Sequence, residues 1–363
     1  MLEIRCSGLA RPMTCAGSLF FKDLPVQETN AAAEEGTAAG EYLQFLLENN
    51  MQAPKAHAAK NGVPFDDDMK FYTTPIAEKI LSIGVPVRCE QRIDWQTRSG
   101  IMIRGQYDIS YVHNNILYVE DLKYGWGIVE PNENWQLLGY AIGEVIRLQQ
   151  PFDKIVFRIH QPRPHHEEGP TRTWELTYAE LLSYKERIDS RMDQIAQGER
   201  SLVTSSKCRY CPAAASACPA ISKAMYRGIE VAHDFLQDDL TDEEVSFQLD
   251  LLARVSEVLK IKQDSLQALA KDRLNSGKLI PNYTMTKKWG HRKWRNDVDP
   301  AAVKALTGKS IVKEQMLSPA EAEKIGVSKD FVNALAEAKY LGMEIKRVDT
   351  TSIGNKIFGK GDK

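Results

Sequence analysis

Residues 105–123, GQYDISYVHNNILYVEDLK, decide how this chain folds. The runs 101–112 and 116–124 are rich in Val, Ile and Tyr, a composition that favours β-strands. Asn114 and Asn115 lie between the two runs, and asparagine tolerates the positive φ of a tight hairpin turn. The sequence therefore predicts two antiparallel strands joined by a two-residue turn.

The register of this hairpin determines where its charged residues lie. With Asn114 and Asn115 as the turn, Asp108 faces Asp121, and strand alternation puts Lys123 on the same side as Asp121. Two facing carboxylates repel each other unless a cation lies between them. The pattern predicts that the two aspartates bind Mg²⁺ or Mn²⁺ and that Lys123 assists phosphodiester hydrolysis. The alternative is a solvated surface hairpin, because a slip of one residue would turn Asp108 to the opposite face.

A helix is predicted after the hairpin, over residues 133–149, where apolar residues recur three and four apart. Gln136 and Tyr140 are four apart and therefore share a face of this helix. Two interpretations remain open at this point. The pair either hydrogen-bonds a nucleic-acid backbone beside the metal or belongs to an ordinary solvated surface.

The other periodic segments complete an α/β arrangement with an antiparallel component. We expect a core over residues 1–220 and a helix-rich C-terminal region over residues 221–363, which contains no cysteine. Strands are predicted over 86–95 and 153–160, and further helices over 35–49, 75–83, 177–197 and 241–275, with another beginning at Ser318.

The composition excludes several classes of protein. The chain has 363 residues, a formal net charge of -2 and 43% hydrophobic residues, which are ordinary values for a globular protein. No apolar run is long enough to span a membrane, and the charged start argues against a signal peptide, so a cytoplasmic protein is expected. The near-zero charge excludes a uniformly basic protein but not nucleic-acid binding, which depends on local charge.

Three cysteines form a separate cluster in the sequence. Cys208, Cys211 and Cys218 follow a C-x₂-C-x₆-C pattern in a chain with only six cysteines, too few for a disulfide scaffold. Thiolates that converge in a reducing compartment usually hold a metal centre. The fourth ligand is expected to be Cys15, with Cys6 as the second candidate. The residues alone leave Zn²⁺ and a [4Fe–4S] cluster open.

Taken in order, these motifs resemble the RecB-like branch of the PD-(D/E)xK nucleases. Within that branch, the chain is similar to a phage and prophage subgroup formerly of unknown function. The matching motifs are Gly105-x-x-Asp108, Asp121-x-Lys123, Gln136-x-x-x-Tyr140, Cys15-Ala16-Gly17-Ser18, Glu35-Gly36-Thr37, Arg292-Lys293-Trp294, and the stretches EDLKYGWG at 120–127 and NWQL at 134–137.

The resemblance implies a restriction-endonuclease-like core, in which helices flank a central mixed β-sheet. It also implies a metal-dependent exonuclease of phage DNA replication, recombination or repair, acting in the host cytoplasm. Its partners would be DNA, single-stranded or with free ends, and phage recombination proteins, and an oligomer is compatible with this. The implied roles are metal ligation by Asp108, Asp121 and the carbonyl of Leu122, catalysis by Lys123, and support by Gln136 and Tyr140, with Glu90 matching a glutamate on the preceding strand.

One position departs from the family pattern. After Glu-Gly-Thr the family places a ligating histidine three residues on, where this chain has Gly40. Glycine cannot bind a metal, so Glu41, or Glu35 from one turn earlier, is the expected substitute. If neither replaces the histidine, the protein is expected to be a DNA-binding or recombination scaffold on a degenerate nuclease fold.

The resemblance also bears on the cysteines. Iron–sulfur nucleases of this group carry one cysteine before the core and three after it, which Cys15, Cys208, Cys211 and Cys218 match. It therefore implies a [4Fe–4S] cluster that joins the two ends of the core, with a structural zinc site as the alternative. Beyond the core, residues 278–295 combine Lys and Arg with Tyr283, a pattern that suits either DNA binding or a solvated rim.

Overall fold

The computed structural model describes residues 2–21, 31–215, 217–234, 240–281 and 283. All of these residues belong to one compact unit, Met1–Met285, and a second unit comprises Thr286–Lys363. The predicted helix at Ser318 and most of the basic segment 278–295 lie outside the described residues. The predicted boundary near residue 220 stays a prediction.

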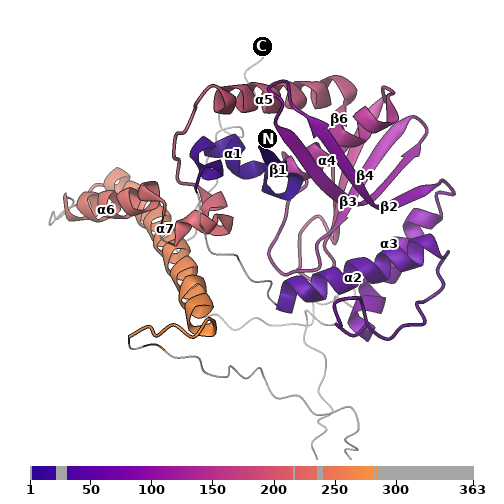
Figure 1. Cartoon of the computed structure of the whole chain (residues 1–363), viewed down its shortest axis with the longest axis horizontal. Helices are drawn as coiled ribbons and strands as arrows, with labels where there is room; N and C mark the ends of the chain where they lie inside the picture. The colour runs from indigo at the N-terminus through magenta and orange to yellow at the C-terminus, as the bar shows by residue number, and fades with distance from the viewer. Residues whose placement is uncertain (1, 22–30, 216, 235–239, 282, 284–363) are drawn as a thin grey trace, which may run out of the picture. The chain divides into compact units, whose positions relative to one another are not determined.

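The described core is built on a six-stranded mixed sheet (Figure 1). The sheet order is β1-β3-β4-β5-β6, with β2 pairing only with β3. The β1–β3 and β4–β5 pairs are parallel, and the other pairs are antiparallel. The strands are β1 (Glu3–Arg5), β2 (Val87–Gln96), β3 (Met102–His113), β4 (Ile116–Leu122), β5 (Lys154–His160) and β6 (Thr171–Thr177).

The predicted hairpin between β3 and β4 is confirmed. Asn114 and Asn115 adopt φ values of 48° and 57°, the left-handed conformation that a two-residue turn requires. His113 pairs with Ile116, and the ladder continues in the predicted register. That register puts Asp121 on the side of the sheet that carries Leu117 and Val119, as alternation requires.

Helices cover both faces of the sheet, as predicted for this fold (Figure 1). One core cluster joins the sheet to α2 (Ala31–Glu48) and α3 (Asp67–Leu81). The other joins it to α4 (Trp135–Leu148), α5 (Tyr178–Ala196) and the N-terminal turns. The N-terminal turns are η1 (Cys6–Gly8), α1 (Ala10–Thr14) and η2 (Ala16–Leu19).

Most helix boundaries follow from capping residues visible in the sequence. A capping box of Thr177 and Glu180 opens α5, and an equivalent box of Thr241 and Glu244 opens α7 (Asp242–Asn275). The prediction was wrong for α3, which begins at Asp67 and not at residue 75. Asp66 accepts a hydrogen bond from the Met69 amide and fixes the earlier start, and the helix tolerates Pro75 in its interior.

The helix-rich C-terminal region is confirmed in its described part. It contains α6 (Pro219–Asp234) and the long α7 (Asp242–Asn275), which pack on each other. They follow two short turns, η3 (Ser206–Tyr210) and η4 (Pro212–Ala214). Lys262 Nζ on α7 donates to the carbonyl of Ala215 at 2.6 Å, which ties α7 to the cysteine-bearing segment. Across the described helices, none combines the length and apolarity needed to cross a membrane.

Candidate active site

The candidate site lies where one edge of β3 changes partners. Because β2 occupies the other edge, β1 and β4 share this edge, pairing with residues 102–104 and 109–113 respectively. Residues 105–108 lie between these pairings and have no ladder partner on this edge within the described strands. The carboxylate of Asp108 therefore lies at an interruption of the sheet, where a side chain can take part in strand pairing.

The Asp108 side chain contacts the backbone of β4, and Asp108 does not pair with Asp121 in the ladder. Its Oδ2 accepts a hydrogen bond from the Leu122 amide at 2.8 Å. The ladder stops at Ile109 and Glu120, one pair short of the two aspartates. The register was predicted correctly, but the ladder pair of Asp108 with Asp121 is replaced by this side-chain contact.

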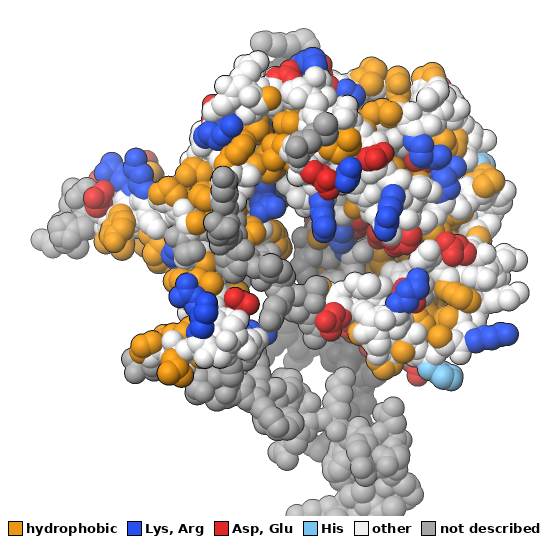
Figure 2. All heavy atoms as spheres, viewed as in Figure 1, with side chains coloured by type: hydrophobic (Ala, Val, Ile, Leu, Met, Phe, Trp, Pro, Cys, Tyr) orange, Lys and Arg blue, Asp and Glu red, His pale blue; other side chains and the backbone are white. Residues whose placement is uncertain are grey.

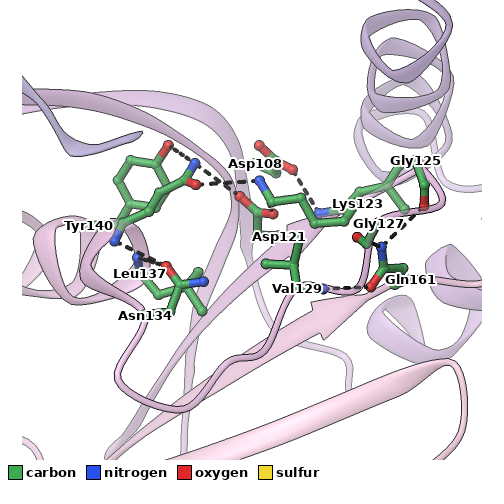
Figure 3. Close-up of polar contacts among 12 residues, drawn as sticks. Asp108, Asp121, Lys123, Gly125, Gly127, Val129, Asn134, Leu137, Tyr140 and Gln161 are labelled. Carbon is green, nitrogen blue, oxygen red and sulfur yellow. Dashed lines mark hydrogen bonds and ion pairs between the residues drawn. The ribbon is translucent and has the colours of Figure 1, made fainter. Parts of the chain in front are cut away.

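Asp121 and Lys123 form a close ion pair beside Asp108 (Figure 3). Lys123 Nζ lies 2.7 Å from Asp121 Oδ2, and the Asp121 side chain is only 1% exposed. Burial and the charge of Asp121 raise the pKa of Asp108 well above its usual value. Burial alone would lower the pKa of Lys123, but the charges of Asp121 and Asp108 outweigh it and raise that pKa. The surface-hairpin alternative is wrong for Asp121, which is buried.

Gln136 and Tyr140 point at Asp121 from the start of α4. Gln136 Nε2 donates to Asp121 Oδ1 at 3.4 Å and to the Tyr140 hydroxyl at 2.8 Å. The Lys123 ammonium donates to Gln136 Oε1 at 3.5 Å. Asn134 caps the helix by accepting from the amides of Gln136 and Leu137, which fixes the first turn (Figure 3). Gln136 therefore contacts Asp121 and Tyr140 contacts Gln136, so the pair does not belong to an ordinary solvated surface.

Gly105 is required by the close approach of α4 and η1. A Cβ at this position would lie 2.6 Å from Tyr140 Cε1 and 2.8 Å from Cys6 Sγ. Cys6 also packs against Gly139, is 1% exposed, and its burial raises the pKa of the thiol to about 12. The structure therefore places Cys6 in the core behind the site and away from the other cysteines of the predicted cluster.

Glu90 lies beside Asp108 at a break in strand alternation. Tyr107 packs in one core cluster and Ile109 in the other, so β3 changes its facing between them. Glu90, on the neighbouring strand, has φ of 49°, a strained value for a non-glycine residue. The Glu90 carboxylate accepts a hydrogen bond from the side-chain amide of Gln106. Burial raises the pKa of Glu90, this hydrogen bond lowers it in part, and the charge of Asp121 raises it further.

The two proposed replacements for the family histidine are engaged elsewhere. Glu41 accepts from the Lys60 amide at 3.1 Å, and Glu35 forms an ion pair with Arg163 at 2.8 Å. A Cβ built on Gly40 would meet no atom within 4 Å, so the helix has room there for a side chain. Within the described residues, no three His, Cys, Asp or Glu side chains are gathered closely enough to bind an ion by themselves.

The two aspartates nevertheless suit a divalent cation. Asp121 is buried and Asp108 is half-buried, and burial followed by the charge of Asp121 raises the pKa of Asp108, which disfavours its charged form. A hard cation such as Mg²⁺ or Mn²⁺ removes that penalty and accepts carboxylate and backbone oxygens. The residues that fit this role are Asp108, Asp121 and the carbonyl of Leu122.

A buried charge network supports β4 from its other face. Glu120 receives hydrogen bonds from Tyr111 at 2.6 Å and Arg158 at 2.7 Å, and it contacts His160 Nε2 at 2.6 Å. Burial would raise the pKa of Glu120, but His160 and Arg158 outweigh it and lower the value to about 2. No local sequence pattern predicts this network, because its members come from three different strands.

The four cysteines named for the metal centre line one pocket. Cys15, Cys208, Cys211 and Cys218 all border it, whereas Cys6 does not. The amide of Val203 donates to Cys15 Sγ at 3.4 Å, and the Ser205 amide donates to Cys208 Sγ at 3.4 Å. Burial, followed by the nearby thiols, raises the pKa of Cys208. Amides aimed at sulfur favour thiolates, so these four cysteines are candidate ligands, although the described structure does not bring three of them close enough to bind an ion.

Two adjoining clefts border the site, and the basic residues that line them outnumber the acidic ones, which are Glu3, Glu130 and Glu133. One is lined by Lys123 and Gln136, the other by Gly105 and Tyr140, and both include Arg5. Figure 2 shows Lys and Arg side chains gathered near a hollow on one face of the molecule. The basic residues that line the two clefts are Arg5, Arg11, Arg92, Arg104, Lys123 and Lys207.

The loop after Lys123 is held by two buried residues that the sequence did not reveal. Gln161 Nε2 donates to the carbonyls of Gly125 and Gly127 at 3.1 and 2.7 Å (Figure 3). Arg172 Nη2 donates to Gln161 Oε1 at 2.6 Å. The missed signal lies in β6, where alternation puts an arginine at an inward position of the strand.

Comparisons with known proteins complete this description. No curated protein matches the chain. Among the solved structures similar to this chain are two with low sequence identity and low TM-scores. The crystal structure of SSO0001 has 13% identity and a TM-score of 0.29, over 61% of this chain and 87% of that one. A phage related exonuclease from Haemophilus somnus 129PT has 14% identity and a TM-score of 0.24, over 54% of this chain and 93% of that one. The family model described as Protein of unknown function (DUF2800) matches residues 3–362, and the chain belongs to that family.

Proposed function

We propose that this protein is a divalent-metal-dependent deoxyribonuclease that acts as an exonuclease on phage DNA. The observation that carries the proposal is the convergence of Asp108, Asp121 and Lys123 at the interrupted edge of β3. Two carboxylates at a buried strand end can hold a divalent cation. The cation and the neighbouring ammonium would then offset the negative charge of the phosphodiester and of its transition state. A role in replication, recombination or repair, with phage recombination proteins as partners, is part of this proposal.

Each residue has a defined task in the proposed reaction. Asp108, Asp121 and the carbonyl of Leu122 would hold Mg²⁺ or Mn²⁺, which when bound polarises the phosphate as a Lewis acid. Lys123 orients the attacking water and offsets the charge that develops on the phosphate oxygens. Gln136 keeps Asp121 oriented, and Tyr140 holds Gln136 through its hydroxyl.

The substrate follows from the charge of the two clefts. A basic groove attracts the phosphate backbone by releasing its counterions, independently of sequence. The arginines on β1, β2 and β3 lie in the cleft next to Tyr140, and Lys123 lies in the other. We therefore propose DNA with single-stranded stretches or free ends as the substrate.

The proposal extends to the cysteine pocket, which we assign to a [4Fe–4S] cluster with Zn²⁺ as the alternative. Cys15 precedes β2 and the other three cysteines follow β6, so the centre would join two ends of the core and shorten the loop between them. Its role would be structural. Iron, sulfide and zinc analysis of anaerobically purified protein distinguishes the two centres, and Cys15→Ser and Cys218→Ser should each lower metal content and stability.

The activity is tested by incubating labelled DNA with pure protein and Mg²⁺ or Mn²⁺. Wild type should shorten the DNA, whereas Asp121→Ala and Lys123→Ala should not. The matched controls are Asp67→Ala and Lys70→Ala, which remove an exposed ion pair of the same kind on α3. Absence of wild-type cleavage with either metal, or equal cleavage by all variants, would rule the proposal out.

A second candidate function is a non-catalytic DNA-binding scaffold. Gly40, where the family has a ligating histidine, is the observation in its favour, together with the engagement of Glu41 by the Lys60 amide. This candidate predicts salt-sensitive DNA binding without hydrolysis and without metal uptake at the two aspartates. Metal-dependent turnover that requires Asp121 would reject it.

A further inference from the structure

A large aromatic side chain is exposed three residues after Lys123. Trp126 is 67% exposed and lies between Gly125 and Gly127, in the loop that joins β4 to α4. Single exposed apolar residues are common on proteins and carry no meaning by themselves. What sets Trp126 apart is the amount of buried polar structure that holds its loop in place.

The backbone on both sides of Trp126 is fixed by Gln161. This side chain is fully buried, and its amide nitrogen donates to the carbonyls of Gly125 and Gly127 at 3.1 and 2.7 Å. Its amide oxygen accepts from the Val129 amide at 3.1 Å (Figure 3). All of these bonds join the backbone of one short loop to Gln161, which follows β5, so the loop is a rigid support and not a free linker.

Arg172 fixes Gln161 in turn. It is 1% exposed, and its Nη2 donates to Gln161 Oε1 at 2.6 Å and to the carbonyl of Val129 at 2.5 Å. A buried arginine is expensive to desolvate, and this one serves the loop rather than the hydrophobic core. The arrangement holds a loop whose most prominent side chain is an exposed indole.

Arg163 orients the indole from one side. Its guanidinium lies 5.4 Å from the Trp126 ring centroid and 4.1 Å from that of Tyr124. Two bonds of 2.8 Å to the Glu35 carboxylate hold the guanidinium in place. Cation–π contact of this kind attracts the ring and leaves most of the indole open, since Trp126 remains 67% exposed.

The same loop borders the cleft that contains the catalytic lysine. Ile128, two residues after Trp126, is 47% exposed and lines that cleft together with Lys123 and Gln136. The loop therefore reaches from the cleft to the indole with its backbone fixed throughout.

From this arrangement we propose that Trp126, oriented by Arg163, is a stacking platform for an unpaired DNA base next to the active site. An indole face stacks on any base without reading its hydrogen-bonding edge, so binding would tolerate all sequences. The bases of a duplex already stack on their neighbours, so the platform selects single-stranded DNA or a frayed end. The inference rests on the proposed function for its substrate but not on catalysis.

The test is equilibrium binding in EDTA, where no turnover occurs. Labelled single-stranded and blunt duplex oligonucleotides are titrated by fluorescence anisotropy with wild type, Trp126→Leu and Trp126→Phe. Because stacking contributes about 1–3 kcal/mol per base, Trp126→Leu should weaken single-strand binding about tenfold, whereas Trp126→Phe should retain most of the affinity. Duplex binding should be unchanged, and Phe71→Ala, which removes an equally exposed aromatic ring on α3, should have no effect.

Several outcomes would overturn the inference. Wild-type affinity of Trp126→Leu for single strands, or an equal loss on single strands and duplex, would show that the indole does not select an unpaired base. The test is independent of the proposed function. If the protein binds DNA through Trp126 but never cleaves it, the nuclease proposal is rejected and the stacking role stands. If the protein cleaves DNA but Trp126 has no effect on binding, the stacking role is rejected and the nuclease proposal stands.

Discussion

The amide of Leu122 donates to the carboxylate of Asp108 at 2.8 Å, so a side chain joins β3 to β4 where the backbone ladder stops. One carboxylate oxygen accepts from the Leu122 amide, and in the proposed function the other oxygen would bind a cation. Strand pairing and the candidate site are therefore coupled through a single residue. The coupling predicts that substitutions of Asp108 separate stability from metal binding.

Asp108→Asn should fold like wild type but lose metal affinity. The asparagine oxygen can still accept from the Leu122 amide, whereas Asp108→Ala leaves that amide without its partner and should cost about 1–3 kcal/mol of unfolding free energy. Denaturant unfolding and Mn²⁺ titration calorimetry measure the two effects. If Asp108→Ala and Asp108→Asn are equally stable, the structural role of Asp108 is contradicted. If Asp108→Asn binds Mn²⁺ as tightly as wild type, the metal role is contradicted.

Lys123→Met should abolish turnover without abolishing metal binding. The ammonium lies 2.7 Å from Asp121 Oδ2 and competes with a cation for that oxygen, so its removal should leave Mn²⁺ affinity equal or higher. Turnover should fall by about a hundredfold or more, because transition-state charge loses its partner. Single-turnover cleavage and calorimetry report the two quantities, with Lys70→Met on α3 as the control. Parallel losses of binding and turnover would mean that Lys123 acts only as structural support.

The ion pairs of Glu144 should make stability depend on pH. Glu144 is buried on α4 between Arg88 of β2 and Arg147, at 2.9 and 2.8 Å. Burial alone would raise its pKa, but the bond from Arg147 and the charge of Arg88 outweigh it and lower the value. A carboxyl with a lowered folded pKa stabilises the protein above its unfolded pKa of about 4.5, and the contribution disappears as pH falls through the folded value.

Glu144→Gln should therefore lower the unfolding free energy by about 1–3 kcal/mol at neutral pH. The difference from wild type should shrink as pH falls below about 4. Denaturant unfolding of both proteins across this pH range is the measurement. A difference that stays constant with pH would mean that Glu144 contributes by packing and not by charge.

The parts of the site that the sequence predicted are those fixed by local rules. Two asparagines set the turn, the turn sets the register, and alternation then places Asp121 and Lys123 on one face. The four-residue spacing of Gln136 and Tyr140 is equally local. The cysteines were grouped from spacing and resemblance, and the structure lines one pocket with the set that includes Cys15 and not Cys6.

The parts that escaped prediction depend on contacts between distant segments. The ladder interruption arises because β1, from the N-terminus, takes the edge of β3 next to β4. Gln161 and Arg172 meet the loop after Lys123 only once β4, β5 and β6 are assembled. The start of α3 differs, because it is set by a local signal: the Asp66 side chain caps the helix at Asp67, ahead of the predicted start at residue 75.

Gly40→His tests whether the missing family ligand limits the site. A Cβ at Gly40 meets no atom within 4 Å among the described residues, and histidine replaces a residue that weakens helices, so stability should be unchanged or slightly higher. If the resemblance is correct, the imidazole completes the metal site, and Mn²⁺ affinity should rise about tenfold, equal to about 1.4 kcal/mol. The control is Gly36→His, one turn earlier on α2 and equally free of close contacts. Equal effects of both substitutions would place the gain in surface histidine binding, and no effect of Gly40→His would separate α2 from the metal site.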